Sequence, residues 1–136
     1  MSDNLANLAR IGNLKVEAFS ETEFKGLVTS ASRRLADARN ESLSAESRFD
    51  LAYNAAHALA LAALRRQGYR SENRTIVFQV LGETAGMASA KYRVLSKCHG
   101  ARNLAEYGGR TDVDVRLLTE LITIAKELEA LVLALK

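Results

Sequence analysis

Residues 44–67 are the segment that most constrains how this chain can fold. Apolar side chains occupy almost every side of a helix drawn through this segment. A helix that is apolar on all sides is normally buried at the centre of a fold. Ser44, with Ser47 or Glu46 after it, is typical of a helix start. The segment therefore predicts a central buried helix that runs to about Gln67.

Composition extends this prediction to the whole chain. The 136 residues include no proline, 48% are hydrophobic and 26% are charged. Proline is the strongest helix breaker, so its absence favours long uninterrupted helices. We expect a single all-α domain over residues 1–136, an antiparallel up-and-down bundle of four to five helices, with residues 1–20 as an N-terminal arm.

A capping box predicts where another helix begins. Ser20 suits the N-cap position, and Glu23 follows three residues later. The helix should end near Arg39. The other expected helices are a short one over 74–82, one from about Ala88 that reaches Tyr107, and a final one from Thr111 or Asp112 to the C-terminus. For residues 74–82 the β-branched side chains leave a strand as the minor alternative.

The longest apolar run, around residues 55–64, is too short to span a bilayer. The N-terminus has no cationic start followed by an apolar block, the pattern of a signal peptide. The single cysteine, Cys98, excludes an intramolecular disulfide and fits a reducing compartment. The sequence therefore predicts a cytoplasmic protein without a membrane segment.

Positive charge is concentrated in the middle third of the chain. Residues 65–110 carry nine Lys and Arg but three Asp and Glu, a net charge of +6. Such a segment is compatible with a phosphate-bearing partner. The alternative is a set of separately solvated arginines that face different ways.

Polar functional groups gather in residues 98–109, CHGARNLAEYGG. Arg102, Asn103 and Tyr107 are side chains that can contact a phosphate or a nucleobase. Asn103 and Tyr107 are four residues apart and share a helix face, as do Arg102 and Glu106, which could equally form an ordinary surface ion pair. The candidate catalytic or ligand-binding residues are His99, Arg102, Asn103 and Tyr107, and the candidate phosphate contacts are Arg93, Lys97 and Arg110.

His57 has no second histidine, cysteine or carboxylate at the spacing of metal ligands. We therefore expect no metal and no cofactor, and we interpret His57 as a core or interface histidine with one hydrogen-bond partner. Cys98 is interpreted as a small apolar residue rather than a reactive thiol.

The order of several motifs resembles the HEPN domain family, small helical-bundle proteins that often accompany minimal nucleotidyltransferases in prokaryotes. The motifs, which together cover most of the chain, are LARIGNLK at 8–15, LADAR at 35–39, RFDLAYNAA at 48–56, GYR at 68–70 and RNLAEY at 102–107.

In catalytic members, the resemblance implies metal-independent RNA cleavage at a dimer interface. Arg102 matches the arginine that would hold the scissile phosphate, and Asn103 matches the polar residue after it. Tyr107 occupies the position of the family's proton-transferring histidine. Tyrosine has an unperturbed pKa of about 10 and is a poor base at neutral pH. His99, three residues before Arg102, is the alternative base.

These features favour a non-catalytic homodimeric module that binds RNA, a nucleotide or a partner protein through the segment around Arg102. The alternatives are a toxin-type, metal-independent endoribonuclease that uses Arg102 with Tyr107 or His99, an accessory subunit of a separately encoded nucleotidyltransferase, and a purely structural dimer. The homodimer is expected because the central helix is apolar on all sides and the final helix carries a broad apolar stripe.

Overall fold

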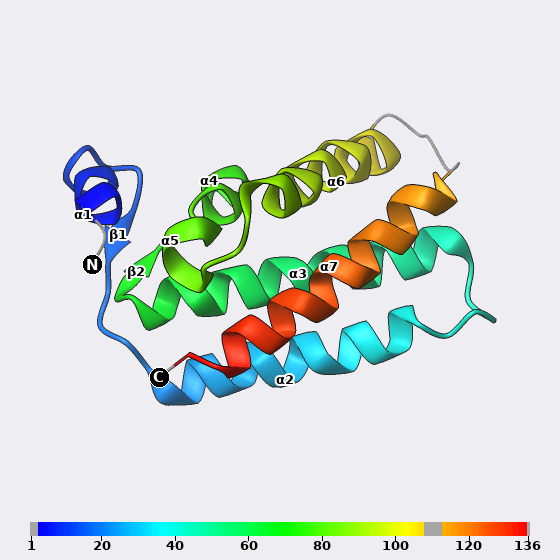
Figure 1. The fold of residues 1–136 in the computed structure, drawn as a ribbon, viewed down its shortest axis with the longest axis horizontal. Helices are drawn as coiled ribbons and strands as arrows, with labels where there is room; N and C mark the ends of the chain where they lie inside the picture. Colours follow the sequence, from blue (N-terminus) through cyan, green and yellow to red (C-terminus); the bar gives the residue numbers. More distant parts are fainter. Residues whose placement is uncertain (1–2, 108–112, 136) are drawn as a thin grey trace.

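The computed structural model describes residues 3–107 and 113–135, with side chains for all of these except residues 104–107. Helices make up most of this part of the chain, and the two strands contain two residues each, so the all-α prediction is confirmed (Figure 1). The elements in chain order are α1 (Asp3–Arg10), β1 (Lys15–Val16), α2 (Glu21–Ala38), α3 (Ala45–Arg66), β2 (Tyr69–Arg70), α4 (Arg74–Gln79), α5 (Leu81–Ala85), α6 (Ser89–Tyr107) and α7 (Val115–Leu133).

Helix α3 is the central element of the fold, as residues 44–67 predict. It contacts α2, α7, α4, α5 and α6, so that each of its sides has a neighbour (Figure 1). Its alanines allow these helices to approach closely, and Ala52, Ala56 and Ala60 are fully buried. The apolar circumference of α3 is therefore covered within one chain.

Side-chain caps fix the starts of the long helices. The hydroxyl of Ser20 accepts a hydrogen bond from the backbone N–H of Glu23, and Ser44 accepts one from the N–H of Ser47. Helix α7 begins later than expected. Its N-cap is Asp114, whose carboxylate accepts hydrogen bonds from two backbone N–H groups, whereas Thr111 and Asp112 lie outside the described residues.

The region expected to be one helix over 74–82 is divided into α4 and α5. Val80 ends the first helix and precedes the second, with φ −92° and ψ 7°, which departs from helical geometry. Gly86 then ends α5 at φ 71°, a left-handed conformation that glycine adopts at little cost. This break lets the short pair pack against both α3 and α6.

The N-terminal segment, expected to be an arm, contains a helix and a short strand. It forms helix α1 and strand β1, which pairs antiparallel with β2 in the register Lys15 with Arg70 and Val16 with Tyr69. Leu5 and Leu14 are buried against the rest of the core. Residues 3–20 therefore form part of the packed domain.

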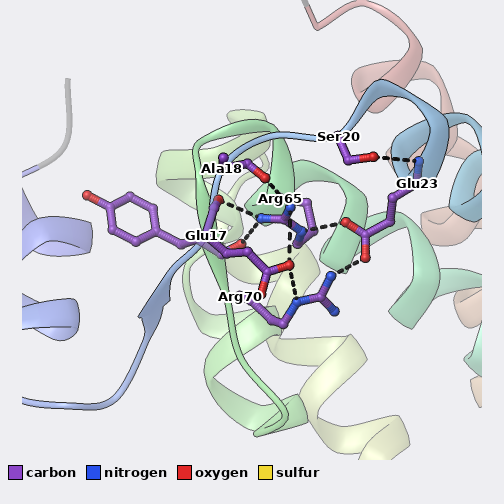
Figure 2. A network of polar contacts seen from close by, with 7 residues as sticks. Glu17, Ala18, Ser20, Glu23, Arg65 and Arg70 are labelled. Atoms are coloured by element: carbon purple, nitrogen blue, oxygen red, sulfur yellow. Dashed lines mark hydrogen bonds and ion pairs between the residues drawn. The ribbon is translucent and has the colours of Figure 1, made fainter.

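A buried arginine joins this segment to the end of α3 (Figure 2). The guanidinium of Arg65, 1% exposed, donates to the backbone carbonyls of Glu17, Ala18 and Tyr69 at 2.9, 2.6 and 3.3 Å. It also donates to the carboxylate of Glu23 at 2.6 Å. We call this set of contacts the Arg65 clasp.

Arg70 reinforces the clasp by donating to the carboxylates of both Glu17 and Glu23 (Figure 2). The Glu23 carboxylate is thus shared between two guanidinium groups. The hydrogen bond from Arg65 is the main cause that holds the pKa of Glu23 below its ordinary value, and Arg70 adds to it against the opposing effect of burial.

Candidate functional site

A stripe of polar residues follows one face of the otherwise apolar helix α3. Asp50, Tyr53, Asn54 and His57 have the spacing i, i+3, i+4 and i+7, which places them in a row on one side of the helix. Helices α4 and α6 each send an arginine to this row. The site is thus built from three helices that are brought together by packing.

Tyr53 and His99 form the link between α3 and α6. The Tyr53 hydroxyl lies 2.7 Å from Nδ1 of His99, and the two rings are stacked with centroids 6.0 Å apart. On the other side of the imidazole, Nδ2 of Asn103 lies 3.4 Å from Nε2. The tautomer with the ring proton on Nδ1 satisfies both contacts, because Nδ1–H then donates to the Tyr53 oxygen and Nε2 accepts from the Asn103 amide.

Two arginines lie close to the buried Tyr53 ring. The guanidinium carbon of Arg74 lies 5.5 Å from the ring centroid and that of Arg102 lies 5.4 Å from it, both within the range of a cation–π interaction. Arg74 also donates to the side-chain oxygen of Asn54 at 3.3 Å, and Arg102 forms an ion pair with Asp50 at 3.7 Å. These contacts hold two positive charges beside one aromatic ring.

The two imidazoles of the cluster are held in the neutral form. Burial lowers the pKa of His57 to about 4, and the charges of Arg74 and Arg102 act in the same direction. Burial also lowers the pKa of His99 from its ordinary value, again with Arg74 and Arg102 contributing. An unprotonated imidazole is the form in which a general base begins its reaction, and the nearby arginines supply positive charge for an anion.

His57 is the last residue of the polar row, at the end farther from the N-terminus of α3. Its ring meets that of Phe78 edge to face with centroids 6.0 Å apart. The buried Nε2 atom has no hydrogen-bond partner among the described residues, so the expectation of one hydrogen-bonded partner is not met at that atom.

The structure brings together His99, Arg102 and Asn103, three of the four principal candidates. The side chain of Tyr107, like Arg110, lies outside the described residues. Arg93 and Lys97 are exposed on α6. At 3.6 residues per turn they lie about 120° and 160° around the helix from His99, so they do not join the cluster. Cys98 is buried, and burial raises the pKa of its thiol to about 12.

Sequence reasoning missed Tyr53, Asn54 and Arg74. Arg74 is at the first position of α4, far in sequence from α6, and only tertiary packing brings it to the cluster. A signal for the α3 residues did exist: Asp50, Asn54 and His57 are polar residues with helical spacing in a segment that is otherwise apolar. Such a stripe must face either solvent or a polar site.

No group of three or more His, Cys, Asp or Glu side chains in residues 3–103 and 113–135 is arranged to hold a metal ion. Nor does any helix in the described ranges combine the length and the apolar character that crossing a bilayer requires. No model of a known protein family matches the chain, and no curated protein matches it. The chemistry of the cluster is therefore the basis for a functional proposal.

Proposed function

We propose that this protein is a HEPN-like module that binds the phosphate of RNA or of a nucleotide between Arg74 and Arg102. The observation that carries the proposal is the convergence of these two guanidinium groups, from α4 and α6, on the ring of Tyr53. Asp50, which is 60% exposed, lies 3.7 Å from Arg102 and forms an ion pair with it.

Guanidinium groups match phosphate oxygens with paired N–H donors, and two of them in one site favour a phosphodiester over a single carboxylate ligand. The half-buried imidazole of His99 adds a flat ring of the kind on which nucleobases stack. The sequence resemblance to HEPN proteins supports RNA as the polymer that carries the phosphate. Together these features support RNA or nucleotide binding over a purely structural role.

Fluorescence anisotropy with a labelled single-stranded RNA of mixed sequence tests this proposal. Arg74→Ala and Arg102→Ala should each weaken binding by about tenfold and reduce the slope of log affinity against log salt by about one. Arg33→Ala is the matched control, because Arg33 is exposed on α2 and α3 lies between α2 and α6 (Figure 1). Equal losses in all three variants would show a diffuse charge effect and contradict the site, as would wild-type protein that does not bind RNA.

One observation favours a second candidate function, metal-independent cleavage of RNA. The neutral His99 imidazole lies on the same helix as Arg102, three residues away, and its lowered pKa leaves it able to accept a proton at neutral pH. His99 would remove the proton from a ribose 2′-hydroxyl, and Arg102 would stabilise the charge that develops on the phosphate.

Cleavage of single-stranded RNA in the presence of EDTA tests the second function. Activity should be lost in His99→Gln and in Arg102→Ala, and it should persist in Arg33→Ala and Tyr107→Phe. If Tyr107→Phe alone abolishes cleavage, the proton transfer belongs to Tyr107. Binding without cleavage supports the first function alone.

We propose separately that the chain forms a homodimer. Since α3 is covered within one chain, the support comes from the exposed apolar residues Val115 and Leu133 of α7, which are 64% and 63% exposed. Light scattering at micromolar concentration should give twice the mass of 14.9 kDa, and a monomeric mass would contradict the dimer.

A further inference from the structure

A groove of about 730 Å³ adjoins the arginine cluster at Arg102. It lies along the start of α3, where Glu46, Ser47 and Asp50 continue the polar row toward the N-terminus of the helix. Apolar side chains, among them Leu43 and Val113, complete its lining. A volume of this size is within the range of small-molecule sites.

Two carboxylates line this groove, and they differ in whether an arginine is paired with them. Glu46 and Asp50 are four residues apart on α3 and therefore share a face of the helix. Asp50 is paired with Arg102 at 3.7 Å, whereas Glu46 forms no ion pair with any described residue. Beyond the positive charge of Arg102, the groove thus presents the carboxylate of Glu46 as a second hydrogen-bond acceptor.

A carboxylate accepts hydrogen bonds and donates none when ionised, so it selects ligands that present N–H groups. Among the nucleobases, guanine presents two adjacent N–H donors on its Watson–Crick edge, which match the two oxygens of one carboxylate. Uracil presents one N–H between two carbonyl oxygens, and these would lie against the negative charge. Apolar walls such as Leu43 and Val113 suit the faces of a base.

We propose that the groove binds the nucleoside next to the phosphate held by Arg102, and that Glu46 makes it selective for guanine over uracil. This inference rests on the proposed phosphate site and adds the identity of the base. Phosphate contacts position a nucleic acid without reading its sequence, and contacts to base edges supply the selectivity.

Calorimetric titration of the full chain with guanosine 5′-monophosphate, uridine 5′-monophosphate and ribose 5-phosphate tests the inference. The guanosine nucleotide should bind about tenfold more tightly than the other two, the lower part of the range for one paired base contact. Glu46→Gln should abolish this preference and leave the affinity for ribose 5-phosphate unchanged. Arg102→Ala should weaken all three ligands.

Ser47→Phe is a second variant, because the added ring fills the groove. The substitution removes the exposed hydrogen bond between the Ser44 and Ser47 hydroxyls but retains the backbone N–H of Ser47 that caps α3, so the variant should fold. It should lose the base preference as Glu46→Gln does. Glu41→Gln, in the connector before α3 and outside the lining of the groove, is the matched charge control and should keep the preference.

The outcomes separate this inference from the function on which it rests. Equal affinities for the three ligands, all reduced in Arg102→Ala, would overturn the base groove and leave the phosphate site intact. A guanine preference that survives in Glu46→Gln would also overturn the assignment of Glu46. If none of the three ligands binds the wild type, the phosphate site fails, and the groove fails with it.

Discussion

The hydroxyl of Tyr53 and Nδ1 of His99 lie 2.7 Å apart and join the central helix α3 to α6. Tyr53 is fully buried and His99 is half-buried, so the hydroxyl of Tyr53 has lost water at this contact. An unpaired group at this place would incur the full cost of its desolvation. The pair therefore contributes to the stability of the fold and fixes the orientation of an imidazole in the candidate site.

Tyr53→Phe should lower the free energy of unfolding by about 1 kcal/mol, because it removes the hydrogen bond and keeps the ring. Urea denaturation followed by circular dichroism measures the change. Tyr92→Phe is the control, since no hydrogen bond of the Tyr92 hydroxyl is seen among the described residues, and it should change stability little. Equal stability of Tyr53→Phe and the wild type would contradict a structural role for the Tyr53–His99 contact.

His57 should make stability depend on pH. Its folded-state pKa of about 4 lies below the ordinary 6.5, so between these values the unfolded chain binds the proton and the folded chain does not. The contribution of His57 is fully present above pH 6.5 and is lost as pH falls toward 4, at no more than about 1.4 kcal/mol per pH unit.

Denaturation at pH 7.5, 6 and 5 measures this dependence. The free energy of unfolding of the wild type should fall more steeply with acidification than that of His57→Phe, which keeps an aromatic ring against Phe78. His99 adds a smaller slope of the same sign to both proteins, because its pKa is also lowered. If the free energy of unfolding depends on pH equally in the two proteins, the pKa of His57 is not lowered in the folded state.

The Arg65 clasp should be a main source of stability. Arg65→Met should destabilise the fold by roughly 3 kcal/mol, because three carbonyls and Glu23 lose a buried donor. Arg66→Met is the control at the next position. Arg66 lies over the rings of Phe19 and Phe24 at 4.7 and 5.9 Å, contacts that contribute about 0.5–1 kcal/mol. Similar losses in both variants, measured by thermal and urea denaturation, would argue against the clasp.

Cys98 should be unreactive while the protein is folded. The residue is fully buried, and burial raises the pKa of its thiol to about 12, so almost no thiolate exists at pH 8. A chromogenic disulfide reagent should therefore react slowly in buffer and stoichiometrically in 6–8 M urea. Fast reaction in buffer would show that α6 opens readily or that the thiol is accessible.

Periodicity predicted the central helix well, because a helix that is buried on all sides carries apolar residues on all sides, as residues 45–66 do. Local capping chemistry likewise identified Ser20 and Ser44. The start of α7 was missed because Thr111, Asp112 and Asp114 are all residue types that suit an N-cap, and the local sequence does not rank them. Local signals thus locate helices better than they locate their ends.

The candidate site was predicted only in part, because local sequence signals find residues that share a helix but not residues that tertiary packing brings together. His99, Arg102 and Asn103 are neighbours on one helix, whereas Arg74 joins them only when α4 packs against α6. The net charge of the middle segment also overstated the positive charge available to a ligand, because it includes Arg65 and Arg70. Both side chains are engaged with Glu17 and Glu23, two residues outside that segment.

The Arg65 clasp also implies how the sequence can drift over generations. Three of its acceptors are main-chain oxygens of residues 17, 18 and 69, and every amino acid supplies such an oxygen. Mutations at Ala18 or Tyr69 that preserve the path of the chain therefore leave the clasp intact. Selection acts instead on the arginine at 65 and on the carboxylate at 23, so descendants of this chain should retain that pair long after the residues around it have changed.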